Sequence, residues 1–152
     1  MALFYTCLAT PYFDRLLYGY LAANAWLSNG ILNAFGTPTH VSGLSIQSTQ
    51  FAVTIERGCD AVEPTWLVLA AILSTPAPLE CKAIGIAAAA AILQLLNLIR
   101  IVTLYWIGFH HPAVFNSAHL EIWPAIFVIS AVALFVCWRR WAGNRFETHA
   151  PA

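Results

Sequence analysis

The sequence predicts an all-α integral membrane protein, a bundle of four transmembrane helices with a small β-hairpin on its outer face. Three observations lead to this fold class: the composition, four long apolar stretches, and one short segment of alternating polarity. Of the 152 residues, 60% are hydrophobic and 9% are charged, whereas soluble domains carry about 25% charged residues. The lipid bilayer is therefore the expected surrounding. The 7 basic and 7 acidic residues balance, which argues against nucleic acid as a partner.

Four apolar stretches have about the length that a membrane-spanning helix requires, roughly 20 mostly apolar residues. They cover approximately residues 16–35, 60–79, 83–109 and 122–138. The N-terminus lacks the basic segment and the cleavage site of a signal peptide, so we expect it to be retained. The chain, residues 1–152, is then a single membrane-embedded domain.

The distribution of Lys and Arg predicts how these helices are oriented, because short cytoplasmic loops are enriched in both residues. With the N-terminus in the cytoplasm, Arg57 alone falls on the outer side, and five basic residues fall on the inner side: Arg15, Lys82, Arg139, Arg140 and Arg145. We therefore expect an inner-membrane protein with both termini in the cytoplasm. Segments 36–58 and 110–121 are then periplasmic.

Between the first two apolar stretches the polarity alternates with a period of two, which is typical of half-buried strands. Apolar side chains recur at Leu44 and Ile46, and again at Phe51, Val53 and Ile55. Residues 47–50 connect the two runs as a turn. The pattern predicts a hairpin over about residues 41–56 on the outer membrane face, with an irregular loop as the alternative.

One charged residue, Arg100, lies inside the third apolar stretch. An Arg at the centre of a membrane helix costs about 2.5–3.5 kcal/mol on the insertion scale, so such residues usually face the protein interior. Asn97 precedes Arg100 by three residues and shares nearly the same helix face. We therefore expect Arg100 to face the bundle, supported by Asn97. The alternative is that Arg100 extends to the membrane surface and only anchors the helix.

Cys59 is the one cysteine of four that this topology places on the outer side. It lies at the head of the second apolar stretch, and a helix N-terminus stabilises a thiolate. That helix begins either at Cys59 or at Pro64. The chain contains no C-x-x-C motif, which argues against a thiol–disulfide relay. An inert buried thiol is the alternative.

His119 also falls on the outer side, just before the fourth stretch, where an ordinary interfacial histidine is the alternative. A metal site shared with His110, His111 and Glu121 is not expected, because their spacing matches no standard zinc pattern. Together, Cys59, Arg100 and His119 supply a nucleophile, a positive group for an oxyanion and a proton acceptor. This chemistry requires no cofactor.

The motifs "RGC" at Cys59, "NLIRI" at Asn97 and Arg100, and "HLEIW" at His119 resemble, in this order, those of the exosortase/archaeosortase family of membrane-embedded cysteine transpeptidases. The resemblance covers about residues 53–141, and the short chain is most similar to the compact exosortase H type. It implies that Cys59 is the nucleophile, Arg100 the charge stabiliser, and His119 the general base and acid.

The same resemblance implies a partner, a secreted protein whose C-terminus carries a short sorting motif, a transmembrane helix and a basic tail. Such an enzyme cleaves the signal through a thioester and transfers the protein to an acceptor. Two other functions stay open on the residues alone. A non-enzymatic membrane scaffold or assembly factor uses Arg100 only for packing with Asn97, and a small transporter uses it as an anion site. The sorting motif, the acceptor and the oligomeric state are not specified by the sequence.

Overall fold

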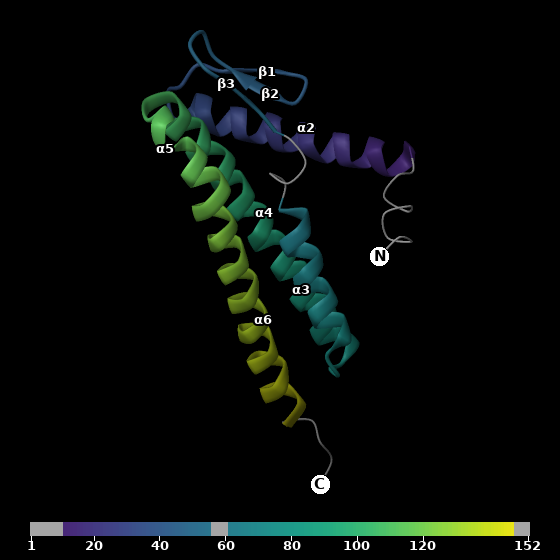
Figure 1. Ribbon diagram of the computed structural model, residues 1–152. Coiled ribbons are helices and arrows are strands. Elements are labelled where there is room, and N and C mark those ends of the chain that lie inside the picture. Colours follow the sequence, from purple (N-terminus) through teal and green to yellow (C-terminus); the bar gives the residue numbers. More distant parts are fainter. Residues whose placement is uncertain (1–10, 56–60, 148–152) are drawn as a thin grey trace.

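The computed structural model describes residues 11–55 and 61–147 (Figure 1). Four main helices account for most of these residues: α2 (Pro11–Ala34), α3 (Val62–Ser74), α4 (Leu79–His110) and α6 (Trp123–Glu147). Two short helical segments, α5 (Pro112–Ser117) and the π-helical turn η1 (Ala118–Ile122), lead directly into α6. The expectation of a mostly helical protein is confirmed for this part of the chain.

Two helices are long and apolar enough to cross a membrane, α4 and the continuous helix over Pro112–Arg145. The prediction of four such helices is therefore supported for two of them. Helix α3 has 13 residues, or about 20 Å at 1.5 Å per residue, against a hydrocarbon core of about 30 Å. Helix α2 has 24 residues, but polar side chains interrupt its apolar sequence and it does not qualify by hydropathy.

The second helix is shorter than the predicted span of about 60–79, because two prolines follow it. Thr75, which precedes Pro76, has the extended conformation (φ −79°, ψ 133°) that a residue before proline prefers. Within the described residues α3 begins at Val62, with Pro64 in its first turn, where the missing N–H of proline is tolerated. The observed start falls between the two that the sequence left open.

The fourth helix starts earlier than the predicted residue 122, at Pro112. Polar residues from Asn116 to Glu121 interrupt its apolar sequence, which is why the sequence suggested a loop. They pass into α6 through the π-helical turn, in which the Trp123 N–H donates to the Ala118 carbonyl. Pro124 explains the position of this irregularity. It has no N–H for the Leu120 carbonyl, and its ring crowds that group.

The predicted hairpin is present, with one strand more than expected. Strands β1 (His40–Ser42), β2 (Ser45–Gln47) and β3 (Ala52–Thr54) form an antiparallel sheet in this order. Ile46 of β2 pairs with Val53 of β3, as the alternation indicated, and also with Val41 of β1. The sequence did not suggest β1, because it has only three residues and joins β2 through a tight turn. Gly43 occupies that turn with a φ of +62°, which favours glycine.

Helices α3, α4 and α6 pack against one another, whereas α2 packs on α4 and on strands β1 and β2. Figure 1 shows that α2 is inclined to the other three helices, so it is not a parallel fourth member of a bundle. An apolar cluster joins α2, the sheet and α4: Leu21, Ala25, Leu32, Ile46, Ile55, Ile101 and Tyr105. The sheet also rests on α4 at Gly108, where a Cβ would clash with the Phe51 ring.

Candidate functional site

Arg100 lies inside the protein, as the sequence predicted, and does not extend to the surface. The residue is 5% exposed. Its guanidinium carbon is 5.5 Å from the centre of the Phe127 ring on α6, which is within the range of a cation–π contact. The aromatic face provides part of the stabilisation that a charge requires once it has been removed from water.

Two cavities adjoin Arg100, one on each side. The larger has a volume of about 220 Å³ and lies between α3 and α6. Besides Arg100, its lining residues are Ala61, Glu63, Pro64, Leu67, Pro124, Phe127 and Val128. The smaller has a volume of about 40 Å³ and lies between the end of β3, α4 and the helix that starts at Pro112. Besides Arg100, its lining residues are Val53, Thr54, Ile55, Ile101, Leu104, Phe115 and His119.

The structure brings His119 to the same small cavity as Arg100. His119 is half-buried in the π-helical turn, and its ring centre lies 5.7 Å from that of Phe115. Turns of this kind are rare and often occur at functional sites, because the extra residue changes the direction in which side chains point. Arg100 and His119 come from different helices, so packing alone makes them neighbours.

Cys59 lies outside the described residues, together with the rest of segment 56–60. The residues on either side of that segment are described. Ile55 lines the small cavity with Arg100 and His119, and Ala61 lines the larger cavity with Arg100. The described residues on either side of that segment, Ile55 and Ala61, therefore each border a cavity that Arg100 also lines.

Asn97 has a different partner from the one expected. Its Nδ2 donates to Oδ1 of Asn24 on α2 at 3.3 Å, and Gln94 Nε2 donates to the same oxygen at 2.6 Å. The Tyr20 hydroxyl donates to Gln94 Oε1 at 2.6 Å. These four residues, Tyr20, Asn24, Gln94 and Asn97, form the α2–α4 polar cluster. Asn97 therefore ties α2 to α4 close to Arg100 and makes no hydrogen bond to the arginine itself.

Sequence reasoning did not single out Tyr20 or Asn24, although a signal was present. Asn24 is a polar residue inside an apolar stretch, and such residues are costly in a membrane unless they find a partner.

As for metals, no three His, Cys, Asp or Glu side chains among the described residues are grouped closely enough to hold an ion.

Comparison with known protein families gives a match over most of the chain, including the elements that form this site. The family model described as transmembrane exosortase (Exosortase_EpsH) matches residues 1–138. That range includes the sheet, both cavities beside Arg100, the π-helical turn with His119 and most of α6. No curated protein and no solved structure matches the chain. The match supports both the membrane location and the resemblance seen in the three motifs, and the chain belongs to the transmembrane exosortase family.

Proposed function

We propose that this protein is a membrane-embedded cysteine transpeptidase that cleaves the C-terminal sorting signal of secreted proteins. One observation carries the proposal. Arg100 and His119, from different helices, line one cavity, and the described neighbours of the segment with Cys59, Ile55 and Ala61, line the cavities on which Arg100 borders.

The proposed reaction divides the transfer into two steps. His119 takes the thiol proton of Cys59, and the sulfur attacks the carbonyl carbon of the scissile peptide bond. Arg100 stabilises the oxyanion, and it does so more strongly in a buried site than in water. The C–N bond breaks, His119 returns the proton to the leaving amine, and a thioester remains on Cys59. An acceptor amine or water then attacks the thioester and restores the thiol.

The sizes of the two cavities suggest how the substrate approaches. The small cavity, about 40 Å³, has room for an oxyanion or a water molecule but not for a peptide side chain. The larger cavity opens between α3 and α6, beside Leu67, which is 68% exposed, and Val128, which is 59% exposed. The transmembrane helix of the substrate is therefore proposed to dock on these apolar surfaces, with the scissile carbonyl directed at Arg100.

The sheet and the Arg100 site are proposed to face the periplasm. Four of the basic residues lie near the start of α4 or in the later turns of α6: Lys82, Arg139, Arg140 and Arg145. Figure 1 shows these segments at the end of the molecule opposite the sheet. Because cytoplasmic ends are enriched in Lys and Arg, the sheet end is the outer one.

The test is the rate at which Cys59 is alkylated as a function of pH, with Cys7, Cys81 and Cys137 replaced by alanine. A free thiol has a pKa of about 8.5, and an activated Cys59 reacts rapidly well below that pH. The His119→Ala variant is expected to lose this reactivity, and Arg100→Ala to lower it. An ordinary profile that is indifferent to both changes would contradict the proposal.

A second readout uses the substrate. Co-expression of the protein with a secreted reporter that carries a sorting signal is expected to yield a processed reporter, and Cys59→Ala to leave it unprocessed. If Cys59→Ala processes the reporter normally, the protein acts as a scaffold or assembly factor rather than as the enzyme.

A further inference from the structure

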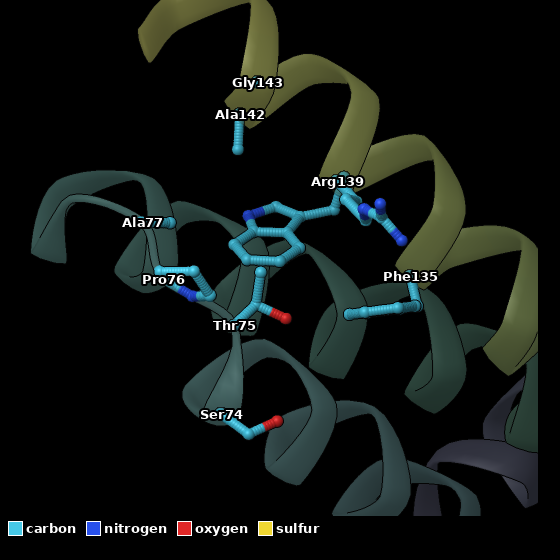
Figure 2. Close-up of a pocket in the computed structure, with 9 residues that line it drawn as sticks. Ser74, Thr75, Pro76, Ala77, Phe135, Arg139, Ala142 and Gly143 are labelled. Atoms are coloured by element: carbon cyan, nitrogen blue, oxygen red, sulfur yellow. The ribbon is translucent and has the colours of Figure 1, made fainter.

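Another cavity lies between the end of α3 and the later turns of α6. Figure 1 shows these segments at the end of the molecule opposite the sheet. The volume of the cavity is about 650 Å³, which is within the range of about 300–1,000 Å³ found for pockets that hold small ligands. Figure 2 shows the end of α3 and the segment after it facing α6 across this cavity: Ser74, Thr75, Pro76 and Ala77 on one side, Phe135, Arg139, Ala142 and Gly143 on the other. Trp138 completes the lining.

The walls of this cavity are apolar and fixed in place. Trp138 is 7% exposed, and its indole N–H donates to the Cys81 carbonyl at 2.8 Å. Gly85 lets the ring pack directly on the α4 backbone, because a Cβ there would clash with it. The Thr75 hydroxyl is already bonded to the Ala71 carbonyl at 2.8 Å. The cavity therefore presents a rigid apolar surface rather than a set of available donors.

The lining of this cavity includes one charged side chain. Of the described residues that line the cavity, only Arg139 is charged, and its side chain is exposed. Arg139 forms no ion pair with any described residue. Lys82, in the first turn of α4, donates a hydrogen bond to the Leu73 carbonyl at 2.8 Å. The site thus combines an apolar interior with one unpaired guanidinium.

The depth of the cavity indicates what kind of molecule reaches it. Trp138 and Trp141 lie at this end of α6, and Arg145 stacks on Trp141 with its guanidinium carbon 5.1 Å from the ring centre. Tryptophans and basic side chains gather where a membrane helix meets the headgroups. At that depth the abundant amphiphile is a phospholipid, and basic pockets between membrane helices bind anionic headgroups. The basic tail of the proposed substrate would be repelled by Arg139.

We propose that this cavity binds an anionic phospholipid, with the phosphate on Arg139 and part of an acyl chain against Phe135 and Trp138. The site is separate from the Arg100 and His119 cavity, so the proposal stands or falls independently of the catalytic one. Its consequence is structural. The lipid fastens the short helix α3 to α6 at the end where the prolines after Ser74 interrupt the chain.

The test is lipid binding to the purified full-length protein in detergent, measured by native mass spectrometry. Phosphatidylglycerol is compared with phosphatidylcholine of the same acyl chains. Arg139→Gln is expected to weaken phosphatidylglycerol binding about fivefold, which corresponds to about 1 kcal/mol for one basic residue near a lipid surface, and to weaken phosphatidylcholine less, because its choline compensates the phosphate charge. Arg140→Gln removes the same charge from the next position of α6, outside the cavity, and is expected to have little effect.

A second variant fills the cavity without removing charge. A Cβ at Gly143 meets no atom within 4 Å, so Gly143→Phe places a ring in the cavity and is expected to weaken both lipids, whereas Gly143→Ala is the matched control. Thermal unfolding in detergent shows that each variant is folded. Equal weakening by Arg139→Gln and Arg140→Gln would reduce the effect to surface charge and overturn the proposal. Displacement of phosphatidylglycerol by inorganic phosphate alone would also overturn it, in favour of a free-phosphate site.

Discussion

At the scale of single residues, two of the buried polar side chains on α4 find partners on other helices. Arg100 has the Phe127 ring, and Asn97 has Asn24. The oxygen of Asn24 accepts hydrogen bonds from two α4 side chains, Gln94 and Asn97. Asn24 is 1% exposed, so no solvent replaces it if it is removed. The α2–α4 polar cluster is thus the specific link between the first helix and the helix that carries Arg100.

Replacing Asn24 tests that link. Asn24→Ala leaves two buried donors without their acceptor and is expected to lower the free energy of unfolding by about 1–2 kcal/mol, since hydrogen bonds between membrane helices average about 0.6 kcal/mol each, with a maximum near 1.7. Tyr20→Phe removes one hydrogen bond from the same cluster and is expected to cost less. Equilibrium unfolding in mixed micelles measures both. Equal costs for the two variants would show that the cluster does not converge on Asn24.

At the scale of elements, the π-helical turn decides where His119 points. The turn contains one residue more than a regular α-helical turn would, and one residue corresponds to about 100° of rotation about the helix axis. Pro124 stands just after it and removes the hydrogen bond that a regular helix would make to Leu120. The side chain of His119 therefore reaches the small cavity only while the irregular turn persists.

Pro124→Ala restores the missing N–H and permits a regular helix. We expect this variant to be as stable as the parent or more stable, and to show Cys59 alkylation at least ten times slower at neutral pH, because His119 rotates away from the cavity. Val128→Ala, one helical turn further along α6, serves as a control for general loosening. Unchanged alkylation in Pro124→Ala would mean that the turn does not position the histidine.

At the scale of the whole molecule, the two ends differ in charge and in chemistry. The sheet, the His119 turn and the cavities beside Arg100 lie toward one end, while the cavity beside Arg139 and most of the described basic residues lie toward the other (Figure 1). The proposed function would use this polarity, because secreted substrates would then arrive at the sheet end. It also makes the orientation directly measurable.

Orientation is tested with single cysteines in a chain whose four native cysteines are replaced by alanine. Gln50 lies exposed in the turn between β2 and β3, and Arg140 is exposed on α6. In intact cells whose outer membrane has been made permeable, an impermeant maleimide is expected to label Gln50→Cys. Labelling of Arg140→Cys is expected only after the inner membrane is opened. The reverse pattern would invert the proposed topology.

The sequence by itself determined the environment, the helical class, the strand alternation around Ile46 and Val53, and the interior position of Arg100. These properties follow from local composition and period, because an apolar helix belongs in lipid and a charge within it must turn inward. The residues around His119 were predicted as a loop because polar residues between Asn116 and Glu121 interrupt the apolar pattern, and no local signal marks a helix that contains a π turn.

Only the tertiary structure decided which side chains meet. Asn97 bonds to a residue 73 positions away, α2 is inclined to the other helices, and Arg100 shares a cavity with His119. None of these facts is encoded in a local pattern. Each depends on how distant helices pack, and packing is determined by the fit of whole surfaces rather than by the character of single segments.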